Sequence, residues 1–228
     1  MRNRTKPERG RFMERFAVAM CFTLLAGTAA AAAPSAATIV KGGNGRGAPA
    51  CASCHGADGG GQAAAGFPRL AGLNAAYLQY QLDSFATGTR SNPVMSPIAK
   101  ALDQDERHAL AEYFSRLPIP AAAANGTAPP AGDALGEHLA TRGRWSRQVP
   151  ACIRCHGPRG VGVGTSFPPL AGQSATYLAN QLRDWQQGKR KNDPLGLMQH
   201  VSSVLDEADI EAVSKWFAAQ PAAPKGGE

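Results

Sequence analysis

The chain has 228 residues and a formal net charge of +7, and 43% of its residues are hydrophobic but only 7% are aromatic. This length suits one large domain or two small ones. The basic residues form no stripe interleaved with aromatic side chains, so the composition argues against nucleic acid as a partner.

The first 33 residues have the order of a secretory signal peptide. A basic segment, MRNRTKPERGRFMER, precedes the apolar FAVAMCFTLLAG and small residues that suit cleavage near residues 32–37. An uncleaved anchor is the alternative, but the apolar run is shorter than the about 20 residues of a membrane span. Export implies a periplasmic protein, for which peripheral membrane association stays open. Without this segment, 18 basic residues face 15 acidic ones.

The rest of the chain consists of two similar halves. GFPRLAGLNAAYLQYQL from Gly66 matches SFPPLAGQSATYLANQL from Ser166, and MSPIAKALDQDERHALAEYF from Met95 matches MQHVSSVLDEADIEAVSKWF from Met198. A repeat of this length indicates a duplicated domain. We expect a first domain over residues 34–117, a Pro/Ala/Gly-rich linker over 118–132, a second domain over 133–221 and a tail over 222–228.

Each half is predicted to be built from helices, because apolar residues recur with a helical period and no segment alternates as a strand does. Short helices are expected over residues 36–41 and from Gly132 onward. A longer helix is expected after each of the N-cap residues Asn74 and Ser174. Gly88 and Gly188 are suited to ending these longer helices. The last helix of each half is expected to begin with a capping box, formed by Asp103 with Glu106 and by Asp206 with Asp209. The predicted fold class is therefore all-α.

Two Cys-x-x-Cys-His motifs hold every cysteine outside the first 33 residues. They are Cys51, Cys54 and His55 in the first half and Cys152, Cys155 and His156 in the second. This spacing fits covalent attachment of a c-type haem, in which two thiols bind the vinyl groups and the histidine reaches the iron.

Other functions of a paired cysteine explain the motifs less well. A redox motif would sit in a βαβ context, and a structural zinc site would need further ligands. Four cysteines in an exported chain ordinarily suggest disulfides, but here both pairs share one spacing and a following histidine. The sequence therefore favours two covalently attached haem c groups.

The region from about Ala36 to Pro221 resembles the di-haem class I cytochromes c of the cytochrome c4 family. The resemblance rests on the two haem motifs, on FPRLAG…YLQYQL and FPPLAG…YLANQL, on a methionine before each last helix, and on the aromatic pairs YF and WF. It implies two tandem class I cytochrome c domains, each built around one covalently bound haem.

By this resemblance, Met95 and Met198 supply the sixth iron ligand opposite the two histidines. Histidine–methionine ligation raises the reduction potential and suits electron transfer. The alternative is that these methionines fill the core. His200 is an alternative ligand for the second iron, which would lower its potential.

The resemblance also suggests residues around the iron ligands. The carbonyls of Pro68 and Pro168 are expected to accept a hydrogen bond from the proximal histidines, and a loop-ending turn is the alternative. Arg90 and Arg190 either pair with haem propionates or are solvated loop residues. His108 and His138 have no counterparts and are expected at the surface. Expected haem-pocket and helix-contact residues are Tyr77, Tyr113, Phe114, Tyr177, Trp185, Trp216 and Phe217.

The predicted function is a periplasmic di-haem electron carrier, not an enzyme, with no catalytic residues and no small-molecule substrate. The resemblance implies a cytochrome bc complex or a dehydrogenase as the donor and a terminal haem–copper oxidase as the acceptor. The alternative is a cytochrome subunit of a periplasmic dehydrogenase, or a di-haem redox enzyme such as a peroxidase or a thiosulfate-oxidising enzyme. A catalytic haem needs an open sixth position, against which the two methionines argue.

Overall fold

The computed structural model describes residues 1–2, 34–126 and 134–223. The predicted signal peptide and parts of the expected linker and tail therefore lie outside the described residues. From Pro34 onward the described chain forms one compact unit. Within the described residues, none of the helices has both the length and the apolar character needed to cross a membrane.

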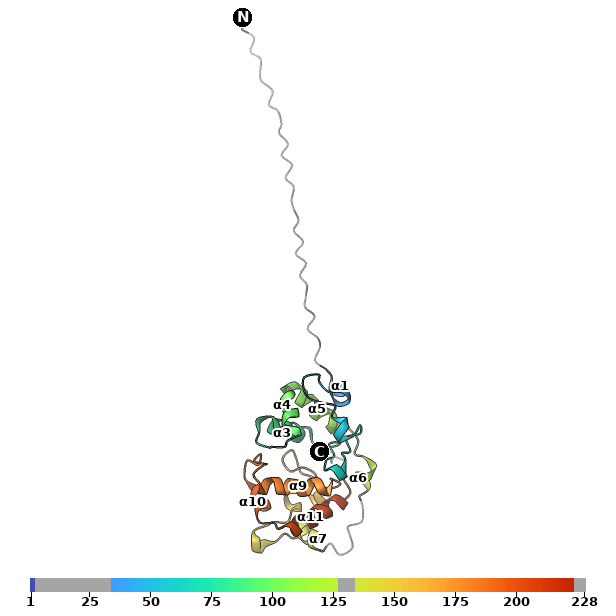
Figure 1. The fold of residues 1–228 in the computed structure, drawn as a ribbon, viewed down its shortest axis with the longest axis vertical. Coiled ribbons are helices and arrows are strands. Elements are labelled where there is room, and N and C mark those ends of the chain that lie inside the picture. Colours follow the sequence, from blue (N-terminus) through green and yellow to red (C-terminus); the bar gives the residue numbers. More distant parts are fainter. Residues whose placement is uncertain (3–33, 127–133, 224–228) are drawn as a thin grey trace. The chain divides into compact units, whose positions relative to one another are not determined.

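Helices make up both halves, and their repeated order follows the repeated sequence. Among the described residues there are isolated β-bridges but no strands, which confirms the predicted all-α class. Figure 1 shows the helices of each half gathered together. The first half contains α1 (Ala36–Gly42), α2 (Ala52–His55), α3 (Ala75–Thr87), α4 (Met95–Ala101) and α5 (Gln104–Arg116); the second contains α7 (Ala134–Thr141), α8 (Ile153–His156), α9 (Ala175–Gln186), α10 (Leu197–Ser203) and α11 (Glu207–Ala219). The described residues also contain three short 3-10 turns: η1 (Ala63–Ala65), η2 (Trp145–Arg147) and η3 (Pro158–Gly160).

The predicted helix starts are confirmed. Asn74 and Ser174 each accept a hydrogen bond from the backbone N–H three residues on, which satisfies a donor that the first turn leaves free. Both last helices begin with a complete capping box. Gly88 ends α3 in the left-handed region, but α9 ends one residue earlier than expected, at Gln186, with Gln187 in the capping position.

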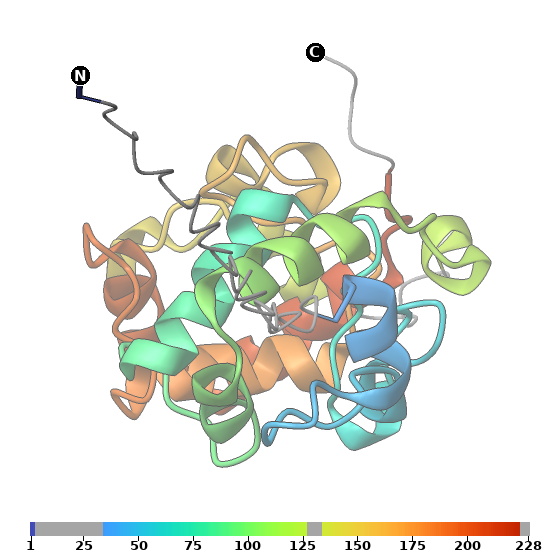
Figure 2. The same ribbon diagram turned by 90° about the horizontal axis from the view of Figure 1, so that it is seen from above.

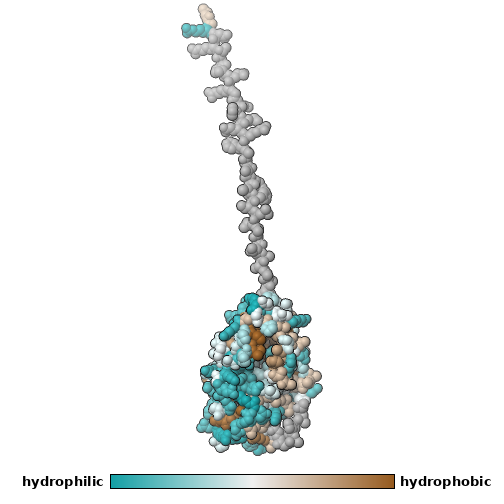
Figure 3. Space-filling model, in the orientation of Figure 1, coloured by the Kyte–Doolittle hydropathy of each residue, from teal (hydrophilic) through white to brown (hydrophobic). Residues whose placement is uncertain are grey.

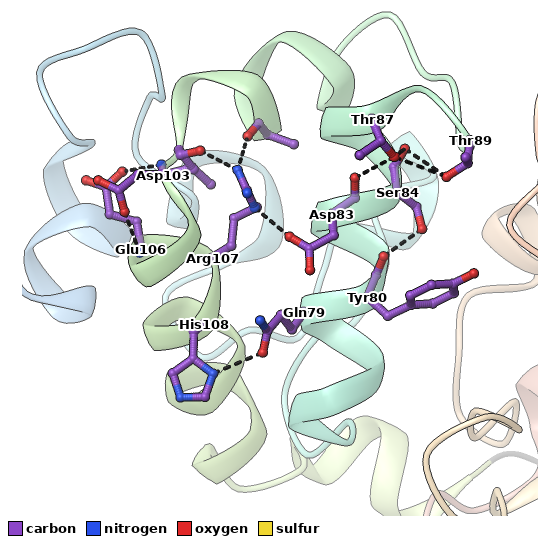
Figure 4. Close-up of polar contacts among 12 residues, drawn as sticks. Gln79, Tyr80, Asp83, Ser84, Thr87, Thr89, Asp103, Glu106, Arg107 and His108 are labelled. Atoms are coloured by element: carbon purple, nitrogen blue, oxygen red, sulfur yellow. Dashed lines mark hydrogen bonds and ion pairs between the residues drawn. The ribbon is translucent and has the colours of Figure 1, made fainter.

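Contacts among α3, α4 and α5 fix the position of the helix that carries Met95. Arg107 on α5 forms an ion pair with Asp83 on α3 at 2.6 Å, and it donates to the carbonyls of Ala99 and Leu102 at the end of α4. Figure 4 shows these contacts together on one side of the first half. Beneath them Leu102, Leu110, Ala111 and Phe114 belong to a buried apolar cluster.

A short helix occupies the segment where the sequence predicts a linker. Residues Ala121–Asn125 form α6, because a run of alanine has the highest helix propensity of any residue type. The carbonyl of Ala123 accepts a hydrogen bond from the N–H of Ala222 at 2.9 Å. Figure 2 shows α6 beside the C-terminal segment, so the start of the expected linker packs on the end of the second half.

The surface carries small apolar areas among hydrophilic residues, as one face in Figure 3 shows. Three exposed apolar side chains lie shortly before Met95 or Met198 in the sequence. Leu195 is 81% exposed, Leu197 47% and Val94 46%. Exposed apolar residues at such positions are relevant to contacts with other proteins.

Candidate cofactor sites

Each Cys-x-x-Cys-His motif folds into a single helical turn. The N–H of His55 donates to the carbonyl of Cys51 at 2.9 Å, and the N–H of His156 donates to that of Cys152 at 3.0 Å. Residues four apart lie on one face of a helix, so each histidine lies on the same side as its first cysteine. None of the four cysteines of the motifs forms a disulfide in the described structure.

A proline carbonyl holds each of these histidines by its Nδ1 atom. Nδ1 of His55 lies 3.0 Å from the carbonyl oxygen of Pro68, and Nδ1 of His156 lies 2.8 Å from that of Pro168. A carbonyl can only accept, so Nδ1 carries the proton and the lone pair is on Nε2. Burial lowers the pKa of both imidazoles, although the proline hydrogen bonds oppose it. Both rings are therefore neutral and able to bind a metal through Nε2.

A glycine closes the loop that follows each motif. The N–H of Gly61 donates to the carbonyl of His55 at 2.8 Å, and Gly162 does the same for His156 at 2.7 Å. Gly61 has a φ of +80°, and a Cβ at this position would lie 2.5 Å from the carbonyl oxygen of Phe67. The backbone next to the histidine therefore leaves no room for a side chain.

Gly61→Ala is expected to lower the free energy of unfolding by about 3 kcal/mol, because it combines left-handed strain with overpacking. Gly45→Ala is a matched control, since Gly45 has a φ of +69° but nothing lies within 4 Å of its Cβ position. The control is expected to cost about 1 kcal/mol. Denaturant unfolding of both variants measures the difference, and equal losses would contradict the close contact at Gly61.

One cavity of about 1050 Å³ is lined by residues of both halves. Its lining is mainly apolar and includes side chains of α3 and α9, which are equivalent helices in the two halves. Met198 lines the cavity, whereas His200 is exposed and is not among the lining residues. The cavity brings together the candidate ligands and attachment residues Cys51, Cys54, His55, Pro68, Met95, Cys152, Cys155, His156, Pro168 and Met198.

Burial keeps the thiol of the first cysteine of each motif protonated. Burial raises the pKa of Cys152 to about 11 and also raises that of Cys51. Within the described parts of the chain, no three or more His, Cys, Asp or Glu residues are grouped as a metal site would require.

Arg90 and Arg190 meet where the two halves join, and both are buried, with 5% and 4% exposure. The alternative prediction, that these two arginines are solvated loop residues, is therefore wrong. Arg90 donates to the side-chain oxygen of Gln81 in its own half at 2.9 Å and to that of Gln181 in the other half at 2.5 Å. Arg190 donates to the same two oxygens at 3.2 Å each.

Aromatic rings cover the guanidinium groups of both arginines. Arg90 lies 4.3 Å from the ring centre of Phe85 and Arg190 lies 3.7 Å from that of Trp185. Neither forms an ion pair with a carboxylate of the described chain. Burial, together with the charge of Arg90, lowers the pKa of Arg190 to about 10, so both remain cations at neutral pH.

This arrangement fits a haem, which joins an apolar macrocycle to two carboxylates. The cavity supplies apolar walls, and buried cations that form no direct ion pair with a carboxylate of the described chain favour an anion beside them. Trp185 also lines the cavity, and its buried indole N–H has no hydrogen-bond partner in the described structure. The chain thus offers thiols, imidazoles and anion-binding groups in one place.

Several polar residues at this junction were given no role in the sequence-based predictions. Gln81 and Gln181 recur at equivalent positions in the two halves, and both are buried. A polar residue repeated inside an otherwise apolar helix stripe was the available signal. Arg69 and Gln173 gave no such signal, because the other half has Pro169 and Leu73 at the equivalent positions.

Comparison with known proteins identifies the family. The cytochrome c family model matches residues 48–118. Cytochrome c4 of Pseudomonas aeruginosa is 37% identical over 208 residues, which cover 90% of this chain and 98% of that protein. The chain is a member of the cytochrome c4 family. It is accordingly a di-haem c-type cytochrome with two covalently attached haem c groups, in tandem class I cytochrome c domains.

Two further relatives of this cytochrome have a more specific name. The thiosulfate dehydrogenase electron acceptor of Stutzerimonas stutzeri is 51% identical over 195 residues, covering 86% of this chain and 90% of that one. The solved thiosulfate dehydrogenase of Marichromatium purpuratum has a TM-score of 0.75 and 45% identity. The match covers 82% of the chain described here and 40% of the solved thiosulfate dehydrogenase chain.

His108 and His138 lie on the surface, away from the two motifs. Both are exposed, and Nδ1 of His108 lies 3.0 Å from the side-chain oxygen of Gln79 (Figure 4). Five of the seven aromatic residues expected in the haem pockets or helix contacts line the cavity: Tyr77, Phe114, Tyr177, Trp185 and Phe217. Tyr113 and Trp216 do not line it but pack in the apolar clusters of their halves.

Proposed function

We propose that this di-haem electron carrier accepts electrons from a periplasmic thiosulfate dehydrogenase and passes them to a terminal haem–copper oxidase. The observation that carries the proposal is the 51% identity with a thiosulfate dehydrogenase electron acceptor, against 37% with the cytochrome c4 of Pseudomonas aeruginosa. A cytochrome bc complex is the alternative donor. Export through the N-terminal segment places the protein in the periplasm.

We further propose the ligands of the two irons. His55 and Met95 hold the first and His156 and Met198 the second, while Pro68 and Pro168 fix the proximal rings. The haem, once bound, supplies the one-electron redox chemistry. The chain would bind each haem through the two thiols of one motif, keeps each Nδ1 protonated, and excludes water with an apolar wall. Met198 is favoured over His200 because Met198 lines the cavity and His200 is exposed.

The surface supports brief contacts with redox partners. Val94 precedes Met95, and Leu195 and Leu197 precede Met198, and all three apolar side chains both line the cavity and are exposed. Electron-transfer complexes are at the small end of interface sizes, so a few apolar contacts around each haem suffice. Two such areas allow one partner to contact each half.

The donor is tested by mixing the oxidised protein with a purified thiosulfate dehydrogenase and thiosulfate. The haem absorption bands are expected to change to those of the reduced form, and to stay oxidised when either the dehydrogenase or thiosulfate is left out. Reduction by a cytochrome bc complex and quinol, with none by the dehydrogenase, would contradict the proposed donor.

The methionine ligands are tested by Met95→Ala and Met198→Ala. Each variant is expected to lose half of the long-wavelength methionine–iron absorption of the oxidised protein, and the affected haem should have a lower potential. His200→Ala serves as the control and is expected to keep the full band. A band of unchanged intensity in Met198→Ala would show that Met198 does not bind the second iron.

A further inference from the structure

The peptide unit that joins Pro68 to Arg69 uses both of its polar atoms. Its carbonyl oxygen lies 3.0 Å from Nδ1 of His55. Its N–H donates to the side-chain oxygen of Gln173 at 2.9 Å. Gln173 belongs to the other half and is 3% exposed. A continuous hydrogen-bond chain therefore runs from the second half, through one peptide, to the histidine of the first half.

Gln173 is fixed in this position by further hydrogen bonds. Its side-chain nitrogen donates to the carbonyl of Arg69 at 3.0 Å, and its oxygen also accepts from the N–H of Ser174 at 3.1 Å. The guanidinium of Arg69 bridges the halves as well, donating to the carbonyls of Ala71 at 2.6 Å and Ala171 at 3.2 Å. The contact is therefore a built part of the junction.

The second half lacks this chain. The carbonyl of Pro168 accepts from His156 at 2.8 Å, but the next residue is Pro169, which has no N–H to donate. The first-half counterpart of Gln173 is Leu73, whose side chain has no acceptor. The two proximal histidines therefore have equivalent direct partners but different second partners.

This difference acts on the electron density of His55. A peptide whose N–H donates a hydrogen bond becomes polarised, so its carbonyl is a stronger acceptor. A stronger acceptor at Nδ1–H raises the basicity of the metal-binding nitrogen. A more basic ligand stabilises ferric over ferrous iron and so lowers the reduction potential.

We infer that Gln173 is a positioning residue that acts across the junction on His55 and lowers the potential of the first haem, with no such effect on the second. This inference rests on the proposed ligation of the first iron by His55. The buried charge of Arg69 acts on the same haem in the opposite direction, so the inference concerns the effect of changing Gln173 and not the order of the two potentials.

The test is Gln173→Met in the full protein with both haems, because methionine has a similar shape but no comparable acceptor. NMR spectra recorded during a redox titration assign each midpoint potential to its haem. The potential of the first haem is expected to rise and that of the second to stay unchanged. In the reduced protein, the Nδ1–H resonance of His55 should move upfield, while that of His156 should not move.

Tyr80→Phe is the matched control. It removes another hydrogen bond between the halves, from the hydroxyl of Tyr80 to the carbonyl of Asn192 at 3.3 Å, and touches neither proximal histidine. Both potentials and both resonances are expected to match those of the unmodified protein. Equal shifts of the two haems in Gln173→Met, or no shift, would overturn the inference.

Gln173→Glu keeps an acceptor for the N–H of Arg69 and provides a second measurement if Gln173→Met does not incorporate haem. Its His55 resonance is expected at the unmodified position or downfield of it, and an upfield shift would overturn the inference. A failure of the proposed ligation is recognised separately. It would appear in the unmodified protein as a missing methionine–iron band or as fewer than two haems.

Discussion

The double variant Cys51→Ser/Cys54→Ser is expected to carry one covalent haem per chain in place of two. Serine keeps the approximate shape of the side chain but cannot form the thioether bonds to the haem vinyl groups. The matched variant Cys152→Ser/Cys155→Ser should lose the other haem. Intact-mass measurement under denaturing conditions counts the attached haems directly.

Each of these variants should also accept one electron where the unmodified protein accepts two, which a coulometric titration measures. The remaining haem is expected to keep its methionine–iron band, because the ligands proposed for each iron come from a single half. Two covalent haems in either variant would contradict the assignment of that motif. Loss of both haems from one variant would contradict the separate ligation of the halves.

The parts of the fold and the site that could be predicted from the sequence depend on residues close together in the chain. A haem motif spans one helical turn, and an N-cap depends on a hydrogen bond over three residues. The caps at Asn74 and Ser174 and both capping boxes were therefore correctly placed. The contact of Pro68 with His55 spans 13 residues, and it was predicted from the family resemblance rather than from local sequence.

The parts that could not be predicted depend on how the halves pack. Gln173 and the backbone of Arg69 are 104 residues apart in the chain, and nothing in either segment indicates that they meet. The same holds for the burial of Arg90 and Arg190, whose loop sequences are compatible with solvent. Local propensity did favour helix α6, but the proline and glycine around its alanines pointed to a linker.

Arg90→Met and Arg190→Met are each expected to lower the free energy of unfolding by about 2 kcal/mol, because each leaves buried acceptors with fewer donors. Their effects should not be additive. The side-chain oxygens of Gln81 and Gln181 accept from both arginines, so a single substitution leaves each oxygen a remaining donor. The double variant removes the arginine donors of both oxygens.

Charge repulsion between the two arginines acts in the same direction. Each single substitution relieves the repulsion, and the second substitution cannot relieve it again. The double variant is therefore expected to lose more than the sum of the single losses, by more than the about 0.5 kcal/mol within which independent sites add. Denaturant unfolding of the di-haem protein measures all four forms.

Arg116→Met is the control, because Arg116 forms an exposed pair with Glu112 and should change stability little. Additive losses would show that the two arginines act independently and that the junction is not a single cluster.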